Sequence, residues 1–237
     1  PSTTSSALAM GANWHVVEGL YEFDMSNYEL FPALAAGDPV KVSDTEYEVT
    51  LRDGAKFSDG TDVTTADVLE SYARTTADTS IYKQFFSFVD SVEAKDDKTI
   101  TIKTKYPFAA VAERFVDVKI VPAASTQEEM TAKPIGTGPY KYESITNTAI
   151  EAVPNEHYNG SKPATVEKIH WDVLKDDAAR LAAALGGTID VMETVPSATK
   201  DQLAAAGWTL DEVPGYNNPF LMFNTSKAPF DNKDVRK

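Results

Sequence analysis

Residues 51–72, LRDGAKFSDGTDVTTADVLESY, combine glycines and aspartates in the way that phosphate-binding and calcium-binding loops do. A phosphate-binding P-loop requires GxxxxGK followed by Ser or Thr, and the interval from Gly54 to Gly60 has neither this spacing nor the lysine. A calcium-binding EF-hand loop needs regularly spaced oxygen ligands around a central glycine, which this run does not supply. We therefore interpret both glycines as turn residues, and Asp53 and Asp59 as side chains that hydrogen-bond to their own backbone.

Metal and nucleophile chemistry find little support in the rest of the sequence. The histidines, His15, His157 and His170, share no metal-ligand spacing, and the absence of cysteine excludes zinc–thiolate sites, disulfides and thiol catalysis. No serine lies in the G-x-S-x-G motif of many hydrolases. Carboxylates are abundant, and their separation in sequence does not report their distance in space. A hydrolase with two catalytic carboxylates therefore stays open as an alternative.

A loop at residues 214–220, PGYNNPF, gathers aromatic and amide side chains: Tyr216, Asn217, Asn218 and Phe220. Aromatic faces and amides are the groups that orient a polar ligand in a concave site. The same residue types also occur in hairpin turns whose aromatic rings join the core. The sequence leaves both interpretations open.

The composition restricts the class of protein. The chain has 237 residues, 42% of them hydrophobic and 10% aromatic, as expected of a folded globular protein. With 22 basic and 36 acidic residues its net charge is −14, which argues against nucleic acid or anionic lipid as a partner. No apolar run approaches the roughly 18 residues expected of a membrane span.

The two ends of the sequence lead to further expectations. The opening PSTTSSALAMGA is small and polar, which is typical of a flexible end, and no signal peptide is visible. The closing KAPFDNKDVRK resembles the first turn of a helix, with Asp231 or Asn232 as its N-cap. Because a domain seldom ends in this way, we expect the chain to be a fragment.

Hydrophobic periodicity predicts a mixture of strands and helices. Tyr47, Val49 and Leu51 alternate with polar residues and predict a half-buried strand, and Thr64 followed by Asp67 predicts a capped helix start. The remaining expectations are a short helix and turn within 14–36, hairpins at 91–107 and 140–155, strands at 118–124, 166–174, 188–195 and within 208–225, and helices at 108–115, 176–187 and 197–208. Without a regular βαβ repeat, this pattern indicates a mixed α+β or α/β protein.

Taken together, several segments resemble the extracytoplasmic solute-binding proteins of ABC importers, family 5, the oligopeptide-, dipeptide- and nickel-binding type. They occur in the family's order and cover nearly the whole chain. The matching segments are VVEGLYEFD, YEVTLRDGAKFSDGTDVTTADVLESY, KPIGTGPYKYES, NEHYNGSKPATVEKI, LGGTIDV and LMFNTSKAPFDNKDVRK.

The resemblance implies an α/β fold, namely a periplasmic-binding-protein-like lobe (class II, peptide-binding type) with an inserted smaller α/β subdomain. The main part of the lobe is expected at 1–40 and 133–237 and the inserted subdomain at 41–132. Family members run to roughly twice this length, so the second lobe is expected to be absent from the chain. The glycine-rich loop at 51–72 then becomes scaffold of the smaller subdomain, outside the ligand cleft.

The resemblance also implies a function without catalysis, catalytic residues, metal or cofactor. The intact protein is expected to capture a small solute between two lobes and to deliver it to ABC permease subunits in the membrane. Peptides are the leading solute class, with nickel chelates and oligosaccharides as alternatives. An adhesion or scaffold module that binds another protein is a further alternative. The protein is expected to be a monomer in the periplasm or on the cell surface, free or held by a lipid on a removed N-terminal segment.

By position within the matched segments, ten residues are expected to face the cleft. A first edge comes from VVEGLYEFD, a second from the inserted subdomain, a third from the GTGPY turn, and the floor from the aromatic loop. In that order they are Glu18, Gly19 and Tyr21; Tyr82; Thr137 and Gly138; and Tyr216, Asn217, Asn218 and Phe220. Without a covering lobe these side chains are expected to be exposed, although Tyr82 fits a place in the core equally well.

Overall fold

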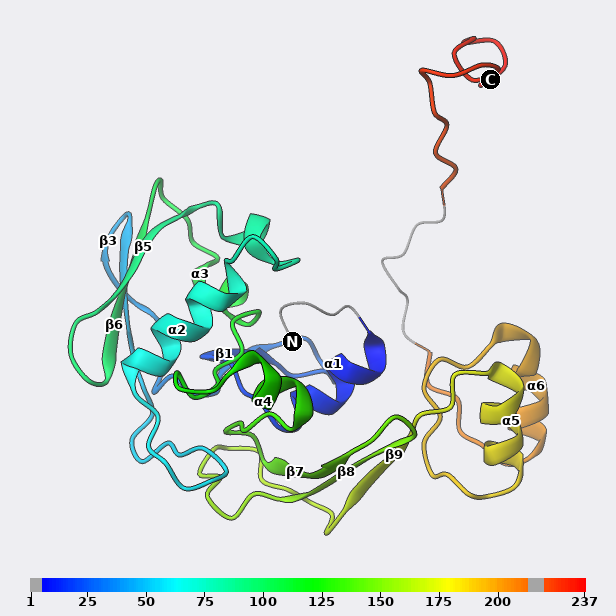
Figure 1. The fold of residues 1–237 in the computed structure, drawn as a ribbon, viewed down its shortest axis with the longest axis horizontal. Helices are drawn as coiled ribbons and strands as arrows, with labels where there is room; N and C mark the ends of the chain where they lie inside the picture. Colours follow the sequence, from blue (N-terminus) through cyan, green and yellow to red (C-terminus); the bar gives the residue numbers. More distant parts are fainter. Residues whose placement is uncertain (1–5, 213–219) are drawn as a thin grey trace. The chain divides into compact units, whose positions relative to one another are not determined.

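A computed structural model describes residues 6–212 and 220–237, in two compact units, Pro1–Val173 and Leu174–Lys237 (Figure 1). No helix of the described residues is long and apolar enough to cross a membrane. Tyr216, Asn217 and Asn218, three of the expected site residues, lie outside the described residues.

The first unit contains three antiparallel sheets and several short helices. A two-stranded sheet pairs β1 (Tyr21–Phe23) with β2 (Leu30–Pro32). A four-stranded sheet has the order β3-β4-β6-β5, from Val40–Ser43, Glu46–Thr50, Thr99–Thr104 and Val89–Ala94. A three-stranded sheet orders β7 (Tyr140–Ile145), β8 (Ala149–Pro154) and β9 (Ile169–Asp172). The helices are α1 (Ala7–Trp14), α2 (Thr65–Thr75), η1 (Lys83–Phe86), α3 (Val111–Phe115) and α4 (Gln127–Ala132).

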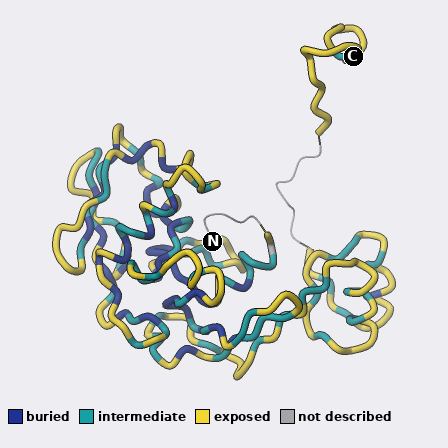
Figure 2. The backbone as a smooth tube through the Cα atoms, in the orientation of Figure 1, coloured by how far each residue is buried: buried dark blue, intermediate teal, exposed yellow. Residues whose placement is uncertain are grey.

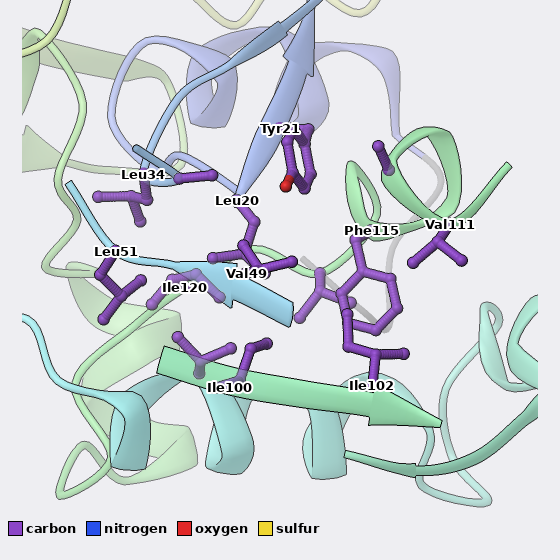
Figure 3. Close-up of a cluster of buried hydrophobic side chains, with 14 of the residues drawn as sticks. Leu20, Tyr21, Leu34, Val49, Leu51, Ile100, Ile102, Val111, Phe115 and Ile120 are labelled. Carbon is purple, nitrogen blue, oxygen red and sulfur yellow. The ribbon is translucent and has the colours of Figure 1, made fainter. Parts of the chain in front are cut away.

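One core joins the four-stranded sheet to the N-terminal segments. Val49 on β4 and Ile100 on β6 alternate with polar neighbours, as a sheet with one buried face requires, and both are fully buried. Figure 3 shows them packed beside Leu20 and Leu34 from the start of the chain. All four strands come from residues 40–104, yet their core is shared across the expected subdomain boundary. The division at 40/41 and 132/133 stays a prediction.

A second, smaller core lies under the three-stranded sheet. It is formed by Ala12 of α1, by Val16 and Val17 that follow this helix, and by Tyr140 and Tyr142 of β7. This packing explains why the small, polar opening of the chain forms a helix at Ala7–Trp14 where we expected flexibility. The residues of Ala7–Met10 have high intrinsic helix propensity, and the tertiary contact stabilises a helix that is too short to form alone.

Turn and cap chemistry largely agrees with expectation. The Thr64 N–H donates to Asp67 Oδ2 at 2.8 Å, which completes the predicted capping box of α2. Gly54 and Gly60 adopt φ of 67° and 89°, in the left-handed region that favours glycine. The Asp59 carboxylate accepts from the Thr61 N–H, as predicted.

The prediction for the other aspartate of this loop was wrong. Asp53 does not bond to its own backbone but forms an ion pair with Lys98. A lysine from the turn between β5 and β6 therefore replaces the local turn bond that the sequence favoured.

The predicted strand at 118–124 does not form, although Val118, Ile120 and Val121 are buried. Its N–H groups find other acceptors: Ile120 donates to the Glu18 carbonyl at 2.9 Å and Val121 to Ser71 Oγ of α2 at 3.1 Å. The segment runs between two elements instead of along a strand.

Other expectations also need correction. Residues 14–36 contain the strands β1 and β2 rather than a helix beginning at Trp14, since α1 ends there. No strand forms at 188–195, nor in the described parts of 208–225, because the described residues offer these segments no strand partner. The expected helical turn at Asp231 is replaced by non-helical turns.

The second unit contains α5 (Asp177–Leu185), η2 (Ser197–Thr199) and α6 (Lys200–Ala205). Asp176 caps α5 by accepting from the Ala179 N–H at 3.0 Å, and Gly187 follows the helix with φ of 68°. The aspartate cap and glycine stop read from the sequence are thus confirmed. Among the described residues of this unit only Ala184 and Leu203 are buried (Figure 2).

Close backbone packing fixes the GTG turn against the segment that follows α1. A Cβ atom at Gly136 would lie 2.0 Å from the Val16 carbonyl oxygen, and one at Gly138 would lie 2.6 Å from that of His15. The Gly138 N–H donates to the Val16 carbonyl at 2.9 Å. Only glycine leaves room for this approach.

We expect Gly136→Ala to lower the free energy of unfolding by about 3 kcal/mol or more, because backbone atoms cannot yield to the added methyl group. Gly11→Ala is the control: its Cβ meets nothing within 4 Å, and alanine suits a helix interior. Urea denaturation measures both. Equal stability of the two variants would show that the turn tolerates a side chain.

Candidate functional site

The buried carboxylate of Glu18 is the centre of the candidate site. Its main chain lies between two segments: Ile120 donates to the Glu18 carbonyl at 2.9 Å, and the GTG turn packs against Val16 just before it. These contacts leave Glu18 only 6% exposed. A nearly buried carboxylate needs a partner or a raised pKa.

Glu18 has both a charged partner and a raised pKa. Burial raises the pKa of Glu18 to about 7, while Arg52, with Nη2 at 3.5 Å from Glu18 Oε2, opposes the shift. The Thr137 hydroxyl also lowers this pKa, although Thr137 Oγ1 is buried and forms no hydrogen bond of normal geometry within the described residues. With a pKa of about 7, Glu18 exists in both protonation states near neutral pH, and the Thr137 hydroxyl lies beside it.

A second buried ion pair lies next to this group. Lys119 pairs with Glu22, and their side chains are only 11% and 15% exposed. Glu22 Oε1 also accepts from the Gly19 N–H at 2.7 Å. Burial raises the pKa of Asp117 on the same segment as Lys119. Sequence reasoning missed these charges, because single acids and bases on strands and loops carry no motif.

Arg52 connects the site to a distant loop. Its Nε donates to Asn159 Oδ1 at 2.9 Å, and Asn159 Nδ2 donates to the Asp53 carbonyl at 2.9 Å. Within the same glycine-rich loop, Ser58 N–H donates to the Gly136 carbonyl at 2.8 Å. The glycine-rich loop that begins at Arg52 therefore connects several segments of the first unit, and Arg52 itself contacts Glu18.

Of the expected site residues, Glu18, Gly19, Thr137 and Gly138 gather in one place. The expectation that these side chains are exposed was wrong for Glu18 and Thr137, which are 6% and 1% exposed, because adjoining backbone segments cover them. Gly19 is required by packing, since a Cβ there would lie 3.0 Å from the Tyr21 carbonyl oxygen.

Tyr21 is a core residue in this structure. It is 1% exposed, and its hydroxyl donates to the Gly37 carbonyl at 3.2 Å. The expected exposure of this ring was therefore wrong too. Its neighbour in sequence, Glu22, carries the charge of this strand instead.

Tyr82 and Phe220 are the remaining expected residues that the structure describes. Tyr82 is half-buried, packs against the core of the four-stranded sheet, and has its ring centroid 6.1 Å from that of Phe85. Phe220, in the second unit, is 74% exposed. The structure describes each of these residues within its own unit, and their joint role in a cleft stays a prediction.

A surface pocket of about 510 Å³ lies elsewhere, on the C-terminal part of α2 and the η1 region. It contains none of the expected site residues. Its lysines already contact protein groups, since Lys83 pairs with Asp78 and Lys105 donates to the Ser87 carbonyl. Among the described residues no cluster of His, Asp or Glu could hold a metal ion.

Comparison with known proteins identifies the class. The model of the bacterial extracellular solute-binding proteins, family 5 (middle region), matches residues 29–237. The chain belongs to this family, and the resemblance read from its sequence is confirmed.

Individual relatives of the chain are also solute-binding proteins. The glutathione-binding protein GsiB of Pectobacterium atrosepticum is 28% identical over 253 residues, covering 100% of this chain and 48% of GsiB. The probable D,D-dipeptide-binding periplasmic protein DdpA of Escherichia coli is 28% identical over 207 residues, covering 81% of this chain and 39% of DdpA. The chain thus spans about half the length of GsiB and less than half of DdpA.

The fold agrees as well. The binding protein MoaA from A. tumefaciens R10, solved in complex with mannopinic acid, superimposes with a TM-score of 0.86 at 22% identity, covering 98% of this chain and 50% of MoaA. The α/β fold of this type, with one lobe of the two, is therefore confirmed.

The raised pKa of Glu18 has a consequence for stability. Between its ordinary value of 4.5 and about 7 the folded state binds this proton more firmly than the unfolded state does, so stability falls as pH rises through that window. A shift of this size corresponds to about 3 kcal/mol.

We expect Glu18→Gln to remove this part of the pH dependence. Relative to the wild type, the variant should gain about 3 kcal/mol of unfolding free energy between pH 4.5 and 7.5, with about 2 kcal/mol as a practical lower bound. Urea denaturation at both pH values measures the difference. Parallel pH profiles for the two proteins would contradict a titrating, buried Glu18.

Proposed function

We propose that the whole protein binds a small solute between two lobes and delivers it to the membrane permease of an ABC importer. The observation that carries the proposal is the family match over residues 29–237. The buried polar groups add physical support, because Thr137 Oγ1 forms no hydrogen bond of normal geometry within the described residues and Glu18 is only loosely paired. Such groups give a ligand something to satisfy.

Peptides are the solute class that we propose. Two relatives carry peptide-binding names, GsiB for glutathione and DdpA for D,D-dipeptides. A peptide offers donors and acceptors that an extended binding mode can use. Nickel chelates and oligosaccharides are the alternatives within the same fold. Since the relatives are binding proteins, we propose no catalytic residue.

The site that we propose combines the described cluster of Glu18, Gly19, Thr137 and Gly138 with Tyr82 and with the aromatic loop. In that loop Phe220 is the described member, and Tyr216, Asn217 and Asn218 complete it. Tyr21 contributes from the core by fixing β1. Solute binding would close the two lobes because the closed form has the higher affinity.

We further propose that the protein works as a monomer outside the cytoplasm, in the periplasm or on the cell surface. The family description, which places these proteins outside the cell, supports this location. Whether a lipid holds the N-terminus is tested by cell fractionation and mass spectrometry of the native protein. A cytoplasmic fraction would contradict the proposal.

Calorimetry of the full-length protein against a tripeptide pool, glutathione, a nickel–histidine complex and an oligosaccharide tests the solute class. We expect binding in the peptide arms. Binding only in the nickel or sugar arm would replace the class, and hydrolysis of a chromogenic glycoside or ester, abolished by one carboxylate substitution, would favour an enzyme.

In the same full-length protein, Tyr216→Ala combined with Phe220→Ala should weaken peptide binding at least tenfold, or about 1.4 kcal/mol, through lost aromatic contacts. Tyr28→Ala combined with Tyr106→Ala is the matched control, since both rings are exposed and outside the proposed site. Unchanged affinity in the first variant would remove the loop from the site.

A further inference from the structure

Arg52 occupies an unusual position for a residue of a surface loop. It lies two residues after the end of β4, at the start of the glycine-rich loop, and its side chain is only 19% exposed. A buried guanidinium carries five N–H donors and needs acceptors on several sides. The structure supplies them from three separate segments.

Two of these acceptors hold the guanidinium in place. Nη1 donates to the Ala33 carbonyl beyond β2, and Nε donates to Asn159 Oδ1 at 2.9 Å. The Tyr158 ring flanks the same group, with Arg52 Cζ 5.8 Å from its centroid. Asn159 is itself fixed, because its Nδ2 donates to the Asp53 carbonyl. These contacts fix the orientation of the Arg52 guanidinium independently of Glu18.

The third contact is the one to Glu18, and it is loose. Nη2 lies 3.5 Å from Glu18 Oε2, longer than the about 2.7–2.9 Å of a strong charge-assisted hydrogen bond. The Glu18 carboxylate therefore interacts with the positive charge of Arg52 without forming a strong hydrogen bond to it.

The groups around Glu18 leave Arg52 with a distinct role. Glu22 on β1 acts against the charged form of Glu18, and the Tyr158 hydroxyl feels the Glu18 charge in turn. Lys119, on the segment that also carries Asp117, is paired with Glu22. Arg52 is accordingly the cation that directly faces Glu18 among the described residues.

We infer that Arg52 is a positioning residue: anchored by Asn159 and Ala33, it keeps a positive charge at a fixed place beside the Glu18 carboxylate. The glycine-rich loop then acts on the site indirectly, because it carries Arg52 and fixes the position of its guanidinium. The use of Glu18 by a solute rests on the proposed function. The arrangement of Arg52 and Glu18 does not.

A pH titration of the Glu18 side-chain carboxyl by ¹³C NMR, on this chain without any solute, tests the inference. In Arg52→Gln the midpoint should rise by about one pH unit or more, the usual effect of losing an adjacent opposite charge. In Arg52→Lys, which keeps the charge but loses the planar fork that bonds to Ala33 and Asn159, the midpoint should rise by about half a pH unit, less than in Arg52→Gln.

Arg74→Gln is the matched control, because Arg74 is also partly buried and paired with an acid, Glu70, but does not contact Glu18. Its Glu18 midpoint should equal that of the wild type. A loss of structure alone would not separate the lysine from the glutamine variant. An unchanged midpoint in Arg52→Gln, or one no higher than in Arg74→Gln, would overturn the inference.

Should Arg52→Gln fail to fold, Asn159→Ala provides the test, since it removes one anchor and keeps the charge. A midpoint raised by about half a pH unit or more supports positioning, and an unchanged midpoint overturns it. No solute is needed in either experiment. Failure of the proposed solute binding is therefore recognised separately, by calorimetry.

Discussion

The structure of the first unit depends on one close backbone approach. Residues 136–138 lie so near the main chain of residues 15–17 that side chains cannot be accommodated at either glycine. This contact brings together the segment after α1, the GTG turn and, through the Ser58–Gly136 hydrogen bond, the glycine-rich loop. Because Thr137 lies between the two glycines, the packing constraint also determines which hydroxyl comes to lie beside Glu18.

Glu18 shows how packing and charge are coupled. The backbone contacts that bury it would make an isolated carboxylate costly, and the protein responds with one loosely placed guanidinium rather than with full hydrogen bonding. A tighter pair would stabilise the unit more, but it would leave no capacity for another partner.

Sequence reasoning recovered the features that depend on local chemistry. The capping box at Thr64, the aspartate cap at Asp176 and the alternation of Val49 and Ile100 each follow from short-range rules. Sequence reasoning failed where contacts between segments far apart in the chain determine the local structure. Residues 118–124 look like a strand, yet their N–H groups bond to the side chains of Ser71 and Asp67 on α2 and to isolated carbonyls such as that of Glu18.

The candidate site was recoverable only in part, for the same reason. Glu18, Thr137 and Gly138 were found through their places in family segments, not through any chemical pattern. The Glu22–Lys119 pair and the contact of Arg52 with Glu18 join residues that lie far apart in sequence. Tyr21 looked like a ligand-facing aromatic residue, but its hydroxyl is satisfied inside the core.

The hydrogen bond between Arg52 and Asn159 also has a consequence for the order in which the chain can fold. These residues are 107 positions apart, so during synthesis at about 5–20 residues per second the partner of Arg52 emerges roughly 5–20 s later. Until then the four-stranded sheet can pair its strands, which all precede residue 105, while the guanidinium lacks its amide anchor. The strands of this sheet are therefore complete before the last anchor of Arg52 has been synthesised.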